Sequence, residues 1–252
     1  MTSPLLLEIC CDSIDSALAA ERGGAQRIEL CSSLLEGGLT PSVGFIRTAR
    51  ANTSVALFAM IRPRGGDFCY SESEFEAMRE DILLAKASGA DGVVLGLLAE
   101  DGNIDVARSA ALVELASPLP VTFHRAFDLS ADLERSLENV IKTGARRILT
   151  SGGVPTAPEG VEQIWRLVQA AGDRIRLIAG SGINSENAAQ LITRSGVHEI
   201  HASAKAKIPS PMRLRKNVPM GSTGNEEYTR FVANEEEVRR LARVLRDLEA
   251  TH

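Results

Sequence analysis

The sequence predicts a (β/α)8 barrel, the α/β fold in which eight parallel strands alternate with eight helices. Short apolar segments of strand length alternate with longer amphipathic segments along the whole chain. Eight such pairs can be counted, and the 252 residues match the roughly 250 that this fold needs. An open, doubly wound sheet is the alternative, but eight units without an inserted domain favour a closed barrel. We therefore expect residues 1–252 to form a single TIM-barrel domain.

The eight strands are predicted from short apolar runs, several of which follow a Gly-Ala pair. Such pairs occur at 24–25, 89–90 and 144–145, and they suit a chain that leaves a helix and enters a strand. The predicted strands are residues 5–10, 27–31, 55–61, 92–95, 121–124, 147–150, 174–179 and 199–202.

The helices between these strands are predicted from their end signals. Ser71 and Glu74 form a start signal, Gly89 a stop signal, and Pro118 and Pro120 end another helix. The predicted helices are residues 12–22, 42–50, 73–88, 105–115, 132–143, 160–171, 185–194 and 235–248.

The longest segment without a clear pattern is 205–234, after the eighth strand. A loop of this length in a compact domain is usually a functional lid or is disordered. Its apolar Met212, Leu214 and Met220 favour packing, either across the barrel mouth or against a second subunit. We therefore expect this segment to contribute to a homodimer.

Composition and charge exclude several kinds of partner. The net charge of −5 argues against general binding to nucleic acid or to an anionic membrane. No apolar run approaches the roughly 20 residues of a membrane span, and residues 1–4 do not resemble a signal peptide. The four cysteines include no Cys-x-x-Cys frame, so free thiols in a reducing cytoplasm are expected.

Two strands near the N-terminus end in the same Glu-x-Cys frame. Glu8 and Cys10 share one face of the first strand, and Glu29 and Cys31 share one face of the second. If these strands are neighbours, two carboxylates and two thiols would meet at their carboxyl ends. Ligands and chemistry lie at that end of the strands in barrel enzymes.

Three further polar residues fall on the face expected to point into the barrel, where Val, Ile and Leu usually dominate. They are Arg62, His124 and His201. Together with Glu8 and Glu29 they could act as acid and base groups beside a cation in a catalytic site. A purely structural network of ion pairs at the barrel mouth is the alternative.

An anion or phosphate site is predicted from the loops after the later strands. Barrel enzymes often bind phosphate after strands seven and eight, with backbone N–H groups and hydroxyls as donors. The candidate residues for this site are Arg64, Ser151, Gly180, Ser181, Gly182 and Ser203. Tight turns use the same residue types, so a turn without a ligand is the alternative.

Cys10 and Cys31 also permit a metal site. Thiolates, with the thioether of Met60 as a possible third ligand, suit Cu(I). Two small, buried free thiols are the alternative, since such cysteines are common in protein cores.

Several motifs resemble the CutC family. They include Leu-Glu-Ile-Cys at 7–10, Arg-Ile-Glu-Leu-Cys at 27–31, and Met-Ile-Arg-Pro-Arg-Gly-Gly-Asp-Phe at 60–68. Thr-Phe-His-Arg-Ala-Phe-Asp at 122–128 matches as well, and the likeness covers essentially the whole chain. The resemblance implies a cytoplasmic barrel protein of copper homeostasis that dimerises, with Cu(I) on Cys10 and Cys31.

Two functions therefore remain open from the sequence. The first, implied by the resemblance, is copper handling. The second is a barrel enzyme for a small anionic or phosphorylated substrate, with Arg62 and Arg64 as the anion clamp.

Overall fold

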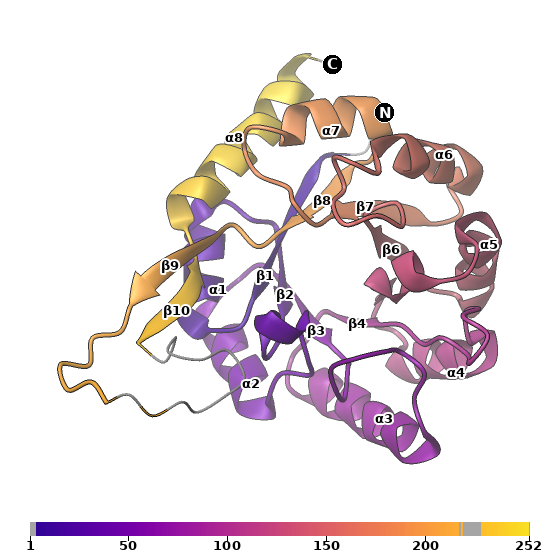
Figure 1. Ribbon diagram of the computed structural model, residues 1–252, viewed down its shortest axis with the longest axis horizontal. Coiled ribbons are helices and arrows are strands. Elements are labelled where there is room, and N and C mark those ends of the chain that lie inside the picture. Colours follow the sequence, from indigo (N-terminus) through magenta and orange to yellow (C-terminus); the bar gives the residue numbers. More distant parts are fainter. Residues whose placement is uncertain (1–3, 217, 219–227, 252) are drawn as a thin grey trace.

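Eight parallel strands close into a barrel that helices surround (Figure 1). The computed structural model describes residues 4–216, 218 and 228–251. Within these residues each of the first seven strands pairs with the next, and β8 pairs with β1. The predicted (β/α)8 barrel is confirmed.

The barrel strands are β1 Leu6–Cys11, β2 Arg27–Leu30, β3 Ala56–Met60, β4 Gly92–Leu95, β5 Val121–Phe123, β6 Arg147–Thr150, β7 Arg176–Gly180 and β8 Glu199–Ala202. The helices are α1 Ile14–Gly23, α2 Val43–Asn52, α3 Glu72–Ala87, α4 Val106–Ala116, α5 Leu133–Thr143, α6 Val161–Ala171, α7 Ala188–Ser195 and α8 Glu235–Thr251. Two short 3₁₀ helices, η1 Leu34–Glu36 and η2 Arg125–Leu129, follow β2 and β5.

Local sequence signals explain where the helices begin and end. Ser71 and Glu74 form the predicted capping box at the start of α3, each side chain accepting a bond from the other's backbone N–H. Gly24 ends α1 with a φ of 100°, a left-handed conformation that glycine adopts without steric cost. None of the helices in the described ranges is long and apolar enough to cross a membrane.

The main core lies between the barrel and the surrounding helices. Ile9, Leu30 and Cys11 are fully buried there. The side chains that alternate with them point to the barrel axis, and many of these are charged. Strand alternation thus places apolar groups outside the barrel wall and the Glu-x-Cys groups inside it.

The register between β1 and its neighbours decides which polar groups meet. Cys10 lies opposite Glu29 on β2, whereas Glu8 lies opposite Arg27 on β2 and His201 on β8. The identical Glu-x-Cys frames suggested that thiol would meet thiol and carboxylate would meet carboxylate. The stagger of strands that closes a barrel offsets them instead, so that Cys10 is beside Glu29.

The segment predicted to be irregular contains two more strands. β9 Lys205–Pro209 and β10 Thr229–Ala233 pair as an antiparallel ribbon beside α1, in orange and yellow in Figure 1. The expectation of a loop throughout 205–234 was therefore wrong at both ends. β9 alternates exposed and half-buried side chains in the run Lys-Ala-Lys-Ile, which could have indicated a strand, whereas β10 shows no such alternation.

Two apolar side chains of this segment do not pack over the mouth as predicted. Met212 is 58% exposed and Leu214 is 69% exposed. Met220 lies outside the described residues. The expectation of packing across the mouth is therefore wrong for Met212 and Leu214, while homodimer formation stays a prediction.

Candidate functional site

A cavity of about 950 Å³ opens at the carboxyl ends of the barrel strands. This volume falls in the range of small-molecule sites. Six of the residues that line it were singled out from the sequence as possible catalytic residues or metal ligands: Cys10, Glu29, Met60, Arg62, His124 and His201. Residues of the β9–β10 ribbon, including Lys205 and Phe231, also line the cavity.

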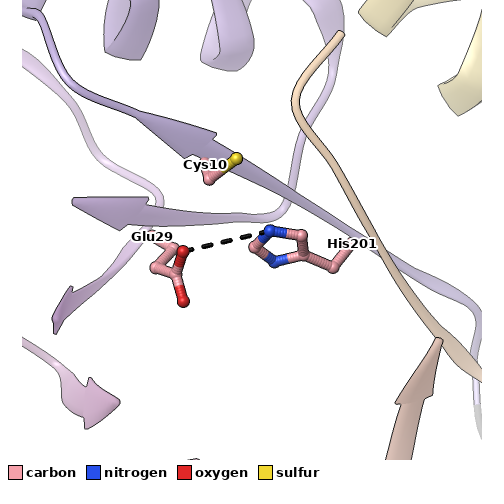
Figure 2. A group of neighbouring side chains, drawn as sticks. All are labelled: Cys10, Glu29 and His201. Atoms are coloured by element: carbon pink, nitrogen blue, oxygen red, sulfur yellow. Dashed lines mark ion pairs between the residues drawn. The ribbon is translucent and has the colours of Figure 1, made fainter. Parts of the chain in front are cut away.

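Three potential metal ligands meet on one wall of this cavity. A sulfur of Cys10, a carboxylate oxygen of Glu29 and a ring nitrogen of His201 all lie within 4.8 Å of one another. They come from β1, β2 and β8, three neighbouring strands whose register brings them together (Figure 2). Sulfur, nitrogen and oxygen donors at this spacing could hold a single ion.

His201 is oriented by a carboxylate behind it. Its Nδ1 lies 2.7 Å from Oε1 of Glu8, and its Nε2 lies 3.9 Å from Oε2 of Glu29. Burial opposes ionisation of Glu8, but Arg27 and His201 outweigh it and lower the pKa of Glu8 to about 2. Because Glu8 is ionised and can only accept, Nδ1 of His201 carries the hydrogen and Nε2 is directed toward the other two ligands.

The charge of Glu8 is balanced by a buried network at the base of the site. Nε of Arg27 bonds to the Glu8 carboxylate, and Nη2 of Arg27 bonds to Glu199 at 2.6 Å. Arg147 also pairs with Glu199, and the Arg27 guanidinium stacks 4.9 Å above the ring of Phe58. Glu8 does not line the cavity. An ion-pair network therefore exists below the cavity, and of the residues expected to form one at the mouth it includes Glu8 and His201 but not Arg62 or His124.

Glu29 and Cys31 are coupled by a hydrogen bond. Sγ of Cys31 donates to Oε2 of Glu29 at 3.3 Å, while Oε1 of Glu29 is buried without a partner among the described residues. Burial, and the charge on Glu8, raise the pKa of Glu29. Burial, and the charge on Glu29, raise the pKa of Cys31 well above its usual value. Cys31 packs with Met60 and does not line the cavity, so the two predicted metal thiols differ in access.

The pKa of His201 is also raised. Burial lowers the pKa of His201, but electrostatic interactions with Cys10 and Glu29 and hydrogen bonds with Cys10 and Glu8 raise it well above its usual value. The protonated ring therefore neutralises part of the negative charge on this wall when no metal is bound.

Arg62 and His124 form a second group of polar atoms in the same cavity. Nη1 of Arg62 donates to the carbonyls of Glu36 and Gly38 at 2.7 and 3.1 Å, and its guanidinium stacks 4.8 Å above Phe68. Burial, and then the charge of Arg62, lower the pKa of His124 to about 3. His124 is therefore a neutral imidazole at any physiological pH.

Three of the residues predicted for an anion site lie elsewhere. Arg64 bonds to Glu74 at 2.6 Å and does not reach the cavity lining. Ser151 is fully buried, and its hydroxyl bonds to Arg125 and Asp128. Gly180 is the last residue of β7, where any Cβ would lie 2.6 Å from Leu149 Cδ1.

Ser181, Gly182 and Ser203 do line the cavity. Ser181 has a φ of 81°, and its hydroxyl donates to the carbonyl of Pro155 at 2.8 Å. That hydroxyl hydrogen is therefore already engaged. The anion site at these three residues stays a prediction.

Arg27 is the main residue that the sequence analysis missed. It shares a strand face with Glu29 by simple alternation, so its position inside the barrel could have been predicted. Arg147 begins β6 and points inward in the same way. Neither residue is a ligand candidate, but Arg27 fixes Glu8, the carboxylate that orients His201, and Arg147 fixes Glu199.

A protein-family model matches most of this chain. The model of the CutC family matches residues 5–206. This range runs from just before β1 to the start of β9. It includes the potential metal ligands Cys10, Glu29 and His201, and it also includes Arg62 and His124. The chain belongs to the CutC family.

Relatives from bacteria and mammals extend this match. The chain is 49% identical over 241 residues to a CutC protein of Chromobacterium violaceum, covering 95% of this chain and 98% of that protein. It is 47% identical to the copper homeostasis protein cutC homolog of Mus musculus, covering 96% and 90%, and 46% identical to that of Homo sapiens. The family is thus associated by name with copper homeostasis.

A solved CutC structure from Streptococcus agalactiae has the same fold. Its TM-score is 0.75 at 33% identity, over 79% of this chain and 98% of that one. Thiamine phosphate pyrophosphorylase from Pyrococcus furiosus, at a TM-score of 0.59 and 19% identity, shares the barrel fold alone.

Proposed function

We propose that this CutC chain binds Cu(I) at the barrel mouth and handles copper in the cytoplasm. The observation that carries the proposal is the convergence of Cys10, Glu29 and His201 within 4.8 Å. The family name and the four free cysteines, which suit a reducing compartment, support the same function.

The donor atoms fit a soft metal ion. Thiolate and imidazole ligands suit Cu(I), and Cys10 with Nε2 of His201 offers one of each. Cys31 lies next to this group through its bond to Glu29 and packs with Met60. Cys31, as a second thiol, and Met60, as a thioether, are therefore further candidates for the ligand set.

Glu8 prepares His201 for this role. A ligating histidine usually donates its other ring N–H to a carboxylate, which fixes the tautomer and the ring orientation. The contact between Glu8 and Nδ1 of His201 has this arrangement. Ion binding would displace protons from the thiols and from His201, so the affinity is expected to rise with pH.

An anaerobic competition titration against a Cu(I) chelator tests the proposal. The wild-type protein should bind about one ion per chain. Cys10→Ser should weaken binding strongly, Cys31→Ser less strongly, and the double variant should abolish it. Cys69→Ser is the control, because Cys69 is a half-buried thiol in the loop before α3 and is outside this group.

The same titration distinguishes Cu(I) from Zn(II). A Cys, His and Glu set also suits Zn(II), for which a carboxylate is a normal ligand. Glu29→Gln should therefore leave Cu(I) affinity nearly unchanged but reduce Zn(II) affinity. Unchanged Cu(I) affinity in the double cysteine variant would contradict the proposed site.

A further inference from the structure

The turns that follow β7 and β8 lie beside each other at the cavity. The two strands are neighbours in the barrel, and Gly180 at the end of β7 lies opposite His201 on β8 (Figure 1). Ser181 and Gly182 follow β7, Ser203 follows β8, and all three line the cavity. Because neighbouring strands lie about 4.8 Å apart, one small group can contact both turns.

These turns carry hydrogen-bond donors that are not used within the described part of the chain. The N–H groups of Gly182 and Ser203 make no backbone hydrogen bond there, and the hydroxyl of Ser203 has no described partner. The carbonyl of Gly182, in contrast, accepts a bond of 2.9 Å from Nδ2 of Asn187. Gly182 is exposed and Ser203 is half-buried, so a ligand in the cavity can reach both residues.

Both turns are held in a left-handed backbone conformation. Ser181 has a φ of 81° and Ala204 a φ of 42°, and they are two of the three non-glycine residues with positive φ in the described ranges. The hydroxyl of Ser181 donates to the carbonyl of Pro155 at 2.8 Å and so anchors the first turn. Backbone strain of this kind is concentrated at ligand sites, and left-handed turns can present N–H groups to an anion.

The N-terminus of α7, which follows the first turn, cannot serve as the anion site. The N–H group of Ser185 donates to the carboxylate of Glu237 at 2.7 Å. The N–H groups of Glu186 and Asn187 donate to the side-chain oxygen of Asn184. These donors are already used, so the free donors are those of the two turns.

The charges around the cavity favour an anionic ligand. Four cations and two carboxylates line it, although the whole chain has a net charge of −5. The cations are Arg62, Arg125, Lys205 and Arg230, and the carboxylates are Asp12 and Glu29. Lys205 comes two residues after Ser203 and pairs with no described carboxylate; its Nζ lies 5.2 Å from the centre of the Phe231 ring.

A phosphate group suits these donors. It offers three acceptor oxygens and up to two negative charges, which match two backbone N–H groups, a hydroxyl and an ammonium group. The cavity of about 950 Å³ is much larger than inorganic phosphate requires. Leu149 and Ile183 also line it, and these apolar side chains suit the carbon skeleton of an organic ligand.

We propose that the turns after β7 and β8 bind the phosphate group of a small organic phosphate monoester. The donors are the N–H groups of Gly182 and Ser203, the hydroxyl of Ser203 and the ammonium group of Lys205. This site goes beyond copper binding, because none of these residues belongs to the group of metal ligands and the ligand binds without copper.

Glycerol 3-phosphate and glycerol test the proposal, since they differ only in the phosphate group. Each is titrated into copper-free, ¹⁵N-labelled protein while the amide resonances of Gly182 and Ser203 are followed by NMR. Inorganic phosphate and sodium chloride are titrated in parallel. We expect saturable shifts of both amides with glycerol 3-phosphate, weaker binding of inorganic phosphate, and no shift with glycerol.

Variants separate this site from general charge effects. Lys205→Gln and Ser203→Ala should each weaken glycerol 3-phosphate binding by about tenfold or more, since each removes a hydrogen bond to a charged group. Lys207→Gln removes the same charge from the same strand, but Lys207 does not line the cavity, so binding should not change. Both lysines are exposed, so these two variants should fold and decide the result even if Ser203→Ala does not.

Three results would overturn the proposal. One is a response of the Gly182 and Ser203 amides to glycerol 3-phosphate no larger than their response to sodium chloride. Another is equal loss of binding in Lys205→Gln and Lys207→Gln, which would indicate a diffuse charge effect. The third is binding of inorganic phosphate as tight as that of glycerol 3-phosphate, which would exclude recognition of an organic ester.

Discussion

Nδ1 of His201 donates a hydrogen bond of 2.7 Å to the buried carboxylate of Glu8. Arg27 bonds to the other oxygen of the same carboxylate, so Glu8 is fixed between a cation and the imidazole. This contact orients Nε2 of His201 toward Cys10 and Glu29. The chemistry of the candidate metal site thus depends on a residue that no ligand in the cavity would touch.

The first prediction concerns Glu8→Gln. Removing one charge from a buried pair leaves Arg27 less well balanced, which should lower the free energy of unfolding by roughly 3 to 5 kcal/mol. Losing the carboxylate that orients His201 should also weaken Cu(I) binding by about 10- to 100-fold. Urea unfolding and chelator competition measure the two effects.

Glu199→Gln is the matched control for this prediction. Glu199 pairs with Arg27 and Arg147 and makes no described bond to His201. This variant should lose stability to a similar degree but keep its Cu(I) affinity. Equal loss of affinity in both variants would show that Glu8 acts only through stability.

The second prediction concerns a glycine behind His124. A Cβ at Gly96 would lie 2.5 Å from Nδ1 of the His124 ring, which is rigid and buried. Gly96→Ala should therefore destabilise the protein by about 1 to 3 kcal/mol. Thermal unfolding measures this loss.

Gly44→Ala is the same chemical change, but it should raise the stability of the protein instead of lowering it. Gly44 lies in α2, and its Cβ would have only Ser42 Oγ within 4 Å, at 3.9 Å. Because glycine is a poor helix residue, this variant should be more stable by about 0.5 to 1 kcal/mol. A stable Gly96→Ala would mean that the space around His124 is less tightly filled than described.

The third prediction concerns pH. The pKa of His124 is lowered from 6.5 to about 3, so the unfolded chain binds a proton there more readily than the folded protein. Between pH 6.5 and about 3 this group makes the folded state less stable as the pH falls, by about 1.4 kcal/mol per unit. His124→Gln should remove this component.

Urea unfolding of the wild type and of His124→Gln at pH 4.5 to 8 tests the sign. From pH 8 to 6.5 the two stability curves should run parallel. Below pH 6.5 the wild type should lose stability more steeply than the variant. Parallel curves over the whole range would indicate that His124 titrates normally.

The fourth prediction concerns the exposed segment after β9. Met212 and Leu214 present large apolar side chains to solvent in the single chain, and a second subunit would cover such groups. Replacing both with Ser should reduce the dimer fraction in sedimentation velocity. Leu84→Ser, at a 45% exposed position on α3, should not change it. A monomeric wild type would remove the basis of this prediction.

Local alternation was enough to predict much of the fold and part of the site. It placed Glu8, Cys10, Glu29 and His201 inside the barrel, and the structure has them there. It did not predict that Cys10 would lie opposite Glu29, because the stagger between strands is set by closure of the whole barrel.

The other differences between the predicted and the observed structure also arise from contacts between residues that are distant in the sequence. Arg64 was expected at an anion site because it follows a barrel strand, but Glu74 on α3 lies within reach and pairs with it. The pairing of β9 with β10 joins residues twenty or more positions apart. Contacts between distant residues leave little trace in a local pattern of apolar and polar side chains.

Copper X-ray absorption spectroscopy on the protein loaded with one equivalent of Cu(I) tests the central claim most directly. The account predicts a sulfur shell together with a nitrogen contribution from an imidazole. The sulfur shell should weaken in Cys10→Ser, and the imidazole contribution should disappear in His201→Phe. A spectrum without sulfur, or one that neither variant changes, would contradict copper binding by Cys10 and His201.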